Sequence, residues 1–248
     1  MAERLRRAWH ARVEGEGAIV RLAEEEAHHV VRVLRLRPGD RLSVFDGGGR
    51  EWEAVLESAG GWGANVRIGP EMAGVTDPSF PVSVHQALCR PERVEWAIQK
   101  GTEVGASGFR LWPAERSQVD PPSAERLARL GRVALEACKQ SGRRRVPSVE
   151  VEGSLPGTVP PGVVGLLLEA GTGVPPIAVR LAETRPRAAW LVVGPEGGLS
   201  PAESAALAGS GWLPAGLGPR VLRTETAGVI ACALVLHAWG DLGAKAGS

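Results

Sequence analysis

Two segments near the C-terminus of this 248-residue chain combine glycines with charged and hydroxyl side chains. Residues 194–200 read GPEGGLS, and residues 217–227 read LGPRVLRTETA. Glycines allow a ligand to approach the backbone closely, and the free N–H groups at the start of a following helix can bind it. Val221 and Leu222 are apolar residues inside the polar second run, where they can bury a flat group such as an adenine ring. Together the two segments predict a ligand pocket.

The first segment is not a familiar phosphate loop. It lacks the Gly-Lys-Ser/Thr of a P-loop, and it does not match G-x-G-x-x-G. The alternative reading is a tight turn followed by a helix cap. For the second segment, the alternative is a surface pair of Arg223 and Glu225 with a threonine cap on the last helix. Glu196 can accept a hydrogen bond from a ligand hydroxyl or amine.

Alternating strands and helices are expected to position these segments. From Pro81 onward, apolar runs at 82–88, 109–113, 162–171, 188–194 and 212–218 alternate with helical patterns at 91–105, 123–142, 175–183 and 200–209. This alternation predicts an α/β domain with a largely parallel sheet. Ligands bind such sheets at the carboxyl ends of the strands, where the chain leaves each strand. Three of these strand exits carry polar residues. We expect the three exits to build one pocket.

The N-terminal part of the chain has a different pattern. Residues 17–22, 40–47, 50–58 and 63–69 are short strand-like runs bounded by glycines, and residues 23–35 form a helical insert. A linker at 71–81 ends in Pro-Ser-Phe-Pro. These patterns predict a small β-barrel domain over residues 1–72, followed by the α/β domain over residues 73–248.

Composition predicts an ordinary soluble protein. Hydrophobic residues make up 44% of the chain and the net charge is +1, so any basic surface must be local. All but three of the 29 basic residues are arginine, through composition bias or for contacts with phosphate. Cys89, Cys138 and Cys232 are isolated, which argues against disulfides and zinc. The charged N-terminus and the short apolar runs predict no secretion signal and no membrane span, so we expect a cytoplasmic protein.

The motifs occur in the order found in a known family. GPEGGLSPAE followed by LGPRVLRTETA resembles the signature of the RsmE family, the 16S ribosomal RNA (uracil-N3)-methyltransferases of the SPOUT class. HHVVRVLRLRPGD and FDGGG resemble the family's N-terminal motifs. RPERVEWAIQKGTEVGA, ERSQV, EACKQSGRRRVPSV and GDLG match in the middle and at the end. The resemblance covers nearly the whole chain, and several collinear motifs make it specific.

The resemblance implies the fold and the partners. It implies a PUA-like RNA-binding domain followed by a SPOUT α/β domain whose C-terminal segment forms a deep trefoil knot, a topology that general fold rules would exclude. It also implies a homodimer and a bent S-adenosylmethionine in the knot loops, with S-adenosylhomocysteine as the product. No metal is implied. The expected substrate is the uridine at the site numbered 1498 in 16S ribosomal RNA of the small ribosomal subunit.

The implied chemistry is methyl transfer to N3 of that uridine, which must lose its N3 proton. Arg223 is the first candidate to stabilise negative charge on the uracil oxygens. Glu225 or Glu196 is expected to accept the proton or to orient the arginine, and a carboxylate that holds the methionine amino group would look the same in sequence. The candidate cofactor-binding residues are Leu168, Glu169, Gly194, Glu196, Gly197, Leu217, Leu222, Thr224 and Ala227.

Basic residues in both domains are candidates for RNA contacts. They are Arg4, Arg7, Arg32, Arg35, Arg90, Lys100, Arg116, Arg143 and Arg145. Trp9 can stack on a base but reads more readily as a core residue, and His29 reads as a packed or capping histidine. Lys139 stands where family members often have glutamate, and it is expected to add positive charge beside an RNA or dimer surface.

Two alternatives remain at this stage. A ribose 2′-O-methyltransferase of the same fold would share the glycine-rich loops, although such enzymes usually carry a Ser-Leu-Asn motif where this chain has Arg-Thr-Glu-Thr. A non-catalytic ribosomal RNA-binding assembly protein would have no need of Glu196, Arg223 and Glu225 together. Binding of S-adenosylmethionine and the position of the transferred methyl group distinguish the three.

Overall fold

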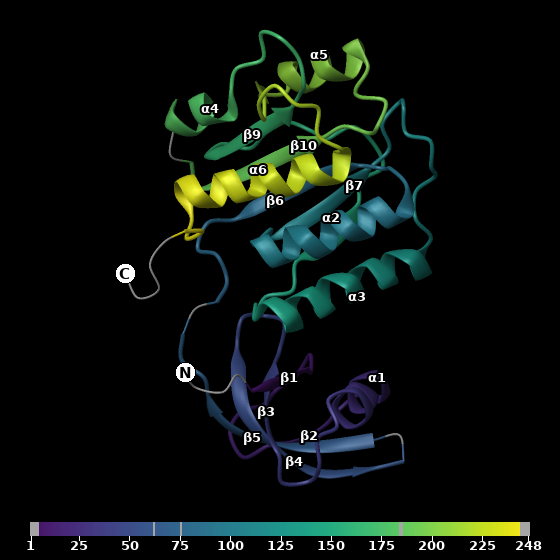
Figure 1. The fold of residues 1–248 in the computed structure, drawn as a ribbon, viewed down its shortest axis with the longest axis vertical. Coiled ribbons are helices and arrows are strands. Elements are labelled where there is room, and N and C mark those ends of the chain that lie inside the picture. Colours follow the sequence, from purple (N-terminus) through teal and green to yellow (C-terminus); the bar gives the residue numbers. More distant parts are fainter. Residues whose placement is uncertain (1–4, 62, 75, 184–185, 244–248) are drawn as a thin grey trace. The chain divides into compact units, whose positions relative to one another are not determined.

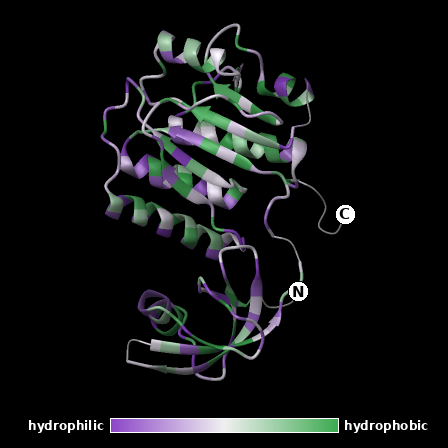
Figure 2. Ribbon diagram, turned by 180° about the vertical axis from the view of Figure 1, so that it is seen from behind, coloured by the Kyte–Doolittle hydropathy of each residue, from purple (hydrophilic) through white to green (hydrophobic). Residues whose placement is uncertain are grey.

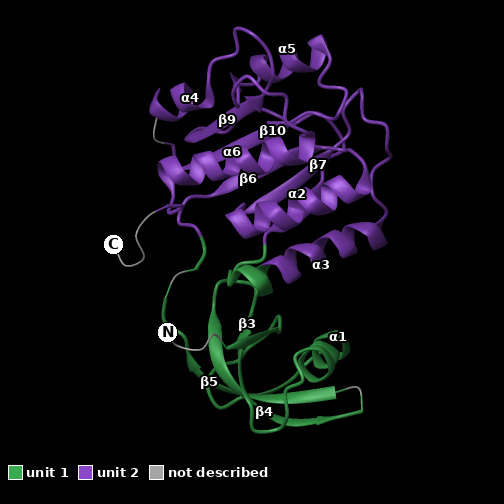
Figure 3. Cartoon of the chain, viewed as in Figure 1, with its two compact units in different colours: residues 1–77, 138–146 green, residues 78–137, 147–248 purple. Residues whose placement is uncertain are grey.

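The computed structural model describes residues 5–61, 63–74, 76–183 and 186–243. These residues form two compact units (Figure 3). One comprises residues 1–77 and 138–146, and the other comprises residues 78–137 and 147–248. The N-terminal unit is therefore discontinuous in sequence, because a segment of nine residues from the middle of the chain belongs to it. Arg4, one of the RNA-binding candidates, lies outside the described residues.

The N-terminal unit contains a five-stranded sheet (Figure 1). β1 pairs in parallel with β3, and the other neighbours are antiparallel. The sheet order is β1 (Arg6–Trp9), β3 (Arg41–Phe45), β4 (Glu51–Gly60), β5 (Gly63–Glu71) and β2 (Ile19–Arg21). A short helix α1 (Glu24–His28) runs directly into a π-helical turn η1 (His29–Val33). The alternating apolar residues of the strands meet in one core around Trp52, Leu42 and Val66.

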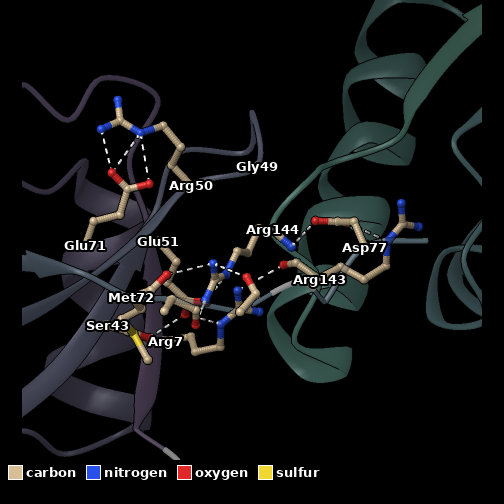
Figure 4. Close-up of polar contacts among 12 residues, drawn as sticks. Arg7, Ser43, Gly49, Arg50, Glu51, Glu71, Met72, Asp77, Arg143 and Arg144 are labelled. Carbon is tan, nitrogen blue, oxygen red and sulfur yellow. Dashed lines mark hydrogen bonds and ion pairs between the residues drawn. The ribbon is translucent and has the colours of Figure 1, made fainter. Parts of the chain in front are cut away.

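Residues 138–146 are held in the N-terminal unit by buried charges (Figure 4). Arg7 Nε donates to Glu51 Oε1 at 2.8 Å, and Arg144 Nε donates to Glu51 Oε2 at 3.0 Å. Asp77 accepts from Arg143 Nε at 3.1 Å and from the backbone N–H of Arg144. All of these side chains are buried or nearly so, so each charge is compensated by a partner, as buried charges must be.

The C-terminal unit contains a six-stranded sheet in which every pairing is parallel. The order is β11 (Trp212–Ala215), β9 (Val163–Leu168), β10 (Ala188–Val193), β6 (Val82–Ala87), β7 (Gly108–Trp112) and β8 (Ser148–Val151). The parallel α/β domain predicted from the sequence is confirmed. The apolar runs predicted every strand of this sheet except β8. This edge strand is short and half-exposed, so it has no apolar run. β1 of the other unit was also missed.

In the described part of the chain, five helices accompany this sheet (Figure 1). They are α2 (Pro91–Val104), α3 (Ala124–Ser141), α4 (Ile177–Glu183), α5 (Pro201–Gly209) and α6 (Thr224–Trp239). α2 packs against α6, and α6 packs on β6 and β10. Seen from behind, the sheet lies in front of these two helices, so α2 and α6 cover the same face (Figure 2). The last residues of α3 belong to the N-terminal unit.

The helix ends follow the local sequence signals. Pro91 occupies the first turn of α2, where its missing N–H costs nothing, and Gly105 ends the helix with a φ of 128°. Ser200 and Glu203 form the capping box predicted for α5. None of the helices in the described ranges has the length and apolar content that a membrane span requires. The trefoil knot stays a prediction.

Candidate functional site

A cavity of about 500 Å³ lies at the carboxyl edge of the parallel sheet. β9, β10 and β11 are neighbours in parallel register, so their three exits meet at this edge. The cavity is lined by the residues that follow each of the three strands, by the start of α6 and by Arg93 of α2. The single pocket expected from three polar strand exits is therefore present in the structure.

The exit of β10 forms a tight glycine turn. Gly198 donates its N–H to the carbonyl oxygen of Pro195 at 2.9 Å, and its φ of 70° lies in the left-handed region. Gly194 lies against Leu199, and a Cβ at Gly194 would lie 3.2 Å from that side chain. Ser200 then caps α5. The turn brings backbone polar groups to the wall of the cavity with little side-chain bulk.

The start of α6 is tied to the exit of β10 by Thr224. Its hydroxyl donates to the carbonyl oxygen of Gly194 at 2.6 Å and accepts from Gln86 Nε2 at 2.7 Å. Thr224 is buried, so these bonds fix the loop that precedes it. Val221 in that loop is 85% exposed and lines the cavity. A large apolar side chain left this exposed at a cavity wall fits the predicted burial of a flat, apolar ligand group.

Two carboxylates, those of Glu169 and Glu196, line the cavity. Glu169, after β9, accepts a hydrogen bond from the hydroxyl of Ser204 at 2.9 Å. Glu196, after β10, accepts from Arg93 Nη1 at 2.8 Å. The cavity therefore combines apolar walls, backbone groups, two carboxylates and an arginine. This set suits S-adenosylmethionine, which carries an adenine ring, ribose hydroxyls and a charged amino-acid group.

Most of the predicted site residues line this one cavity. Gly197 and Glu225 are not among the lining residues: Gly197 lies between two that are, and Glu225 is buried near Arg93. The predicted residues that line the cavity are Leu168, Glu169, Gly194, Glu196, Leu217, Leu222, Arg223, Thr224 and Ala227. No sequence pattern indicated Arg93, which lies about a hundred residues before Glu196, and none indicated Ser204 or Arg220.

A buried thiol lies beneath these charges. Burial, together with the negative charges of Glu196 and Glu225, raises the pKa of the Cys89 thiol to about 12, and the positive charge of Arg93 opposes the shift only in part. Cys89 is therefore a neutral, inert thiol at physiological pH. Arg93 itself faces both glutamates, at 2.8 Å from Glu196 and 3.9 Å from Glu225.

The structure separates the RNA-binding candidates into buried and exposed groups. Arg7 and Arg143 are buried in ion pairs with Glu51 and Asp77, so they present almost no guanidinium surface to RNA. The interpretation of Lys139 as a surface charge was wrong, because the side chain is buried and pairs with Glu26. The burial follows from a carboxylate far away in sequence, which no local pattern reveals.

The remaining candidates are accessible to differing degrees. Arg32, Arg35, Arg90 and Arg145 are exposed. The side chain of Arg116 is exposed but donates to the carbonyl oxygens of Gly197 and Leu199, next to the cavity. Lys100 pairs with Glu103 on its own helix. Trp9 is half-buried, as is His29.

Comparison with known proteins defines first the class of protein. Residues 76–236 match a family model described as an RNA methyltransferase domain, and residues 22–68 match one described as an RNA methyltransferase PUA domain. The fold also matches two solved structures that contain the cofactor. A ribosomal RNA small subunit methyltransferase E from Neisseria gonorrhoeae, bound to S-adenosyl methionine, is 29% identical with a TM-score of 0.87, covering 96% of this chain and 99% of that one. A putative methyltransferase from Legionella pneumophila in complex with the same cofactor is 29% identical with a TM-score of 0.88, covering 97% of this chain and all of that one. The sheet, the cavity and these matches define an S-adenosylmethionine-dependent RNA methyltransferase with a PUA domain.

Curated relatives then narrow the class to one family. The ribosomal RNA small subunit methyltransferase E of Mycobacterium tuberculosis is 37% identical over 231 residues, which is 88% of this chain and 86% of the relative. The protein of the same name from Bacillus subtilis is 31% identical and covers 86% of this chain and 88% of its own length. The chain belongs to the ribosomal RNA small subunit methyltransferase E family, which confirms the resemblance drawn from the motifs.

Proposed function

We propose that this protein transfers the methyl group of S-adenosylmethionine to N3 of a uridine in 16S ribosomal RNA of the small ribosomal subunit. The observation that carries the proposal is the cavity at the ends of β9, β10 and β11, because its lining combines apolar walls with Glu169, Glu196 and Arg223. The names of the curated relatives support ribosomal RNA of the small subunit as the substrate.

The proposed cofactor site is the set of loops at the three strand exits. Leu168, Leu217 and Leu222 offer apolar surface to the adenine ring, and the glycine turn offers backbone groups to the ribose. The carboxylate of Glu169 suits a hydroxyl or ammonium group of the cofactor, and that of Glu196 is a candidate either for such a contact or for the proton acceptor. When bound, S-adenosylmethionine supplies a methyl group on a sulfonium, and the sulfur leaves with the electron pair of the broken C–S bond as a neutral thioether.

The protein must also remove the N3 proton of uracil and stabilise the charge that develops on the ring. Arg223 lines the cavity at the N-cap of α6, and its side chain is exposed, so it can reach the uracil oxygens of an incoming nucleotide. Glu196 and Glu225 are the candidates for proton acceptor. Because N3 lies on the Watson–Crick edge, the target base must be unpaired when it enters.

RNA contacts are proposed for the exposed arginines of both units. A guanidinium binds phosphate through two parallel hydrogen bonds, so exposed arginines suit the RNA backbone. The glycine turn and Arg116 lie together, so RNA bound there would be near the cavity. The proposed RNA contacts are Arg32, Arg35, Arg90, Arg116 and Arg145.

We propose further that two copies of the chain associate through α6. Ile230 and Leu234 lie one turn apart on this helix and remain 41% and 37% exposed. An exposed apolar pair on the helix that carries Thr224 would place a partner next to the cofactor cavity.

The absence of disulfides among the three buried cysteines suits the cytoplasm, where the ribosomal substrate is made.

Nucleoside analysis tests the proposed function. Small ribosomal subunits from a strain that lacks this protein are incubated with the protein and S-adenosylmethionine carrying a labelled methyl group. Digestion to nucleosides followed by mass spectrometry is expected to show labelled 3-methyluridine. A label on a ribose would support 2′-O-methylation instead. Cofactor binding with no transfer would support an assembly protein.

A further inference from the structure

Arg93 stands between the two glutamates that compete for the role of proton acceptor. It lies in the first turn of α2, and its side chain is 24% exposed. Its Nη1 donates to Glu196 Oε1 at 2.8 Å, and its Nε lies 3.9 Å from Glu225 Oε2. One guanidinium thus faces two carboxylates from different strand exits.

The two carboxylates differ in their access to the cavity. The Glu196 side chain is 36% exposed and lines the cavity, whereas that of Glu225 is 11% exposed and is not part of the lining. A proton acceptor must come within hydrogen-bonding distance of the proton that it removes. Of the two, Glu196 is the carboxylate that a base bound in the cavity can reach.

The hydrogen bonds of the two carboxylates also favour Glu196 as the proton acceptor. Arg93 donates to Glu196 Oε1, and none of the described residues donates a hydrogen bond to Glu196 Oε2. This leaves one oxygen of Glu196 available to a substrate at the cavity. Glu225 Oε2 is buried and has no hydrogen bond, and Arg93 is the cation that faces it. A buried carboxylate without such a cation would be costly, so Glu225 depends on Arg93.

We propose that Arg93 is a positioning residue that holds Glu196 in place to accept the N3 proton of uridine, and that Glu225 anchors Arg93 from the buried side. This inference rests on the proposed function and adds to it by separating the roles of the two glutamates. The N3–H bond of uracil breaks, the proton passes to Glu196 Oε2, and the electron pair stays on N3 to form the bond to the methyl carbon. Arg93 stays charged throughout.

The arrangement also favours uracil over cytosine. Uracil presents an N3–H donor, which the carboxylate held by Arg93 can accept. Cytosine has a lone pair at N3 in place of the N–H, so it would repel the Glu196 carboxylate and has no N3 proton to remove. The orientation of Glu196 by Arg93 therefore serves selection of the base as well as removal of its proton.

Four variants and one matched control test the assignment. The variants are Arg93→Ala, Arg93→Lys, Glu196→Gln and Glu225→Gln. The control is Arg129→Ala, which removes an arginine that is also ion-paired to a glutamate, Glu95, but lies outside the cavity lining. Each protein is assayed for single-turnover methyl transfer to small subunits. Its affinity for S-adenosylhomocysteine, measured by calorimetry, is the readout that does not depend on activity.

We expect Glu196→Gln to lower the transfer rate about a hundredfold, as loss of a general base does. Arg93→Ala is expected to lower it about tenfold to a hundredfold, with Arg93→Lys intermediate because it keeps the charge and loses the planar fork. Affinity for S-adenosylhomocysteine should stay within about threefold of wild type, since Arg93 positions Glu196 and does not contact the cofactor. Adding Arg93→Ala to Glu196→Gln should cost little more than Glu196→Gln alone.

A substrate with a more acidic N3–H distinguishes loss of the proton acceptor from a structural defect. Fluorine at C5 of uracil acidifies N3–H, so small subunits reconstituted with 5-fluorouridine should reduce the defects of Arg93→Ala and Glu196→Gln. A merely structural defect would be the same on both substrates. The inference is overturned if Arg93→Ala is as active as Arg129→Ala. It is equally overturned if both variants lose cofactor affinity in proportion to rate, because the pair would then bind the amino-acid group of the cofactor. If the wild-type protein forms no 3-methyluridine, the proposed function itself fails.

Discussion

Arg144 and Arg7 bind the two oxygens of one buried carboxylate, Glu51, although Arg144 is far from both in the sequence. Arg144 Nε donates to Oε2 at 3.0 Å, and Arg7 Nε donates to Oε1 at 2.8 Å. The remaining donors of Arg144 reach the backbone carbonyls of Met72, Ala73 and Gly74. The arginine run at 143–145 therefore completes the N-terminal unit, and only Arg145 of the three remains exposed.

Glu51→Gln should destabilise the N-terminal unit by about 3 kcal/mol, because it leaves two buried guanidinium groups without their carboxylate. Urea unfolding measures the loss, and hydrogen exchange of β3 and β4 locates it. Glu53→Gln is the matched control, since Glu53 forms an exposed pair with Arg41. That substitution should cost less than about 1 kcal/mol. Equal losses from the two substitutions would contradict the structural role of Glu51.

The contribution of Glu51 should also depend on pH. Burial would raise the pKa of its carboxyl group, but hydrogen bonds from Arg7 and Ser43 and the charges of Arg7 and Arg144 outweigh burial and hold the pKa below its ordinary value. A carboxyl whose pKa is lowered by folding contributes stability that is complete above its unfolded pKa and is lost as pH falls through the folded pKa.

The difference in unfolding free energy between wild type and Glu51→Gln should therefore be largest near neutral pH. It should shrink below roughly pH 4, where carboxyl groups of unfolded chains are already protonated. Urea titrations at neutral pH and in acid measure this difference. A difference that stays constant into acid would mean that the carboxylate charge of Glu51 contributes nothing.

Thr224→Val should weaken cofactor binding. The substitution keeps the shape of the side chain but removes its hydrogen bonds to Gly194 and Gln86, so the loop that precedes α6 loses its tie to the β10 exit. Affinity for S-adenosylhomocysteine should fall about tenfold, which corresponds to about 1.4 kcal/mol. Thr226→Val, one half-turn along the same helix, is the control and should bind normally. Equal affinities for both variants would contradict the proposed role of the tie.

Leu234→Glu should convert the proposed dimer into a monomer. The charge is placed on the apolar surface of α6 that Ile230 and Leu234 form, and burying it against a second copy would be costly. Light scattering after size-exclusion chromatography measures the mass of the particle. Leu213→Glu on β11 is a control with the same 37% exposure and should not change the mass. A wild-type protein that is monomeric at micromolar concentration would refute the interface directly.

The sequence was informative wherever function required several signals within one loop. Glycines, an acidic residue and a capping box after β10 predicted the turn around Glu196. The hydroxyl residues before the last apolar helix located its start only roughly: Thr224 or Thr226 was expected to cap it, but the N-cap of α6 is Arg223, without a side-chain cap bond. These signals are local, because the backbone conformation and the helix cap are determined by neighbouring residues. The apolar runs likewise predicted the parallel sheet that brings the loops together.

Contacts between distant segments could not be predicted in the same way. Arg93 lies in an ordinary amphipathic helix, and only the packing of α2 against α6 brings it to Glu196 and Glu225. A run of three arginines ordinarily indicates a solvated surface. Glu51 and Asp77, which form buried ion pairs with Arg144 and Arg143, lie more than sixty residues away. Compensation of a buried charge depends on the tertiary structure, so the sequence pattern does not reveal it.

The central claim is that the cavity at the ends of β9, β10 and β11 carries out methyl transfer to N3 of uridine. The most direct measurement is nucleoside mass spectrometry of unmethylated small ribosomal subunits after incubation with labelled S-adenosylmethionine and either the wild-type protein or Arg223→Ala. We expect labelled 3-methyluridine with wild type and a loss of about a hundredfold or more in rate with Arg223→Ala. Label on a ribose, or 3-methyluridine formed equally by both proteins, would contradict the account.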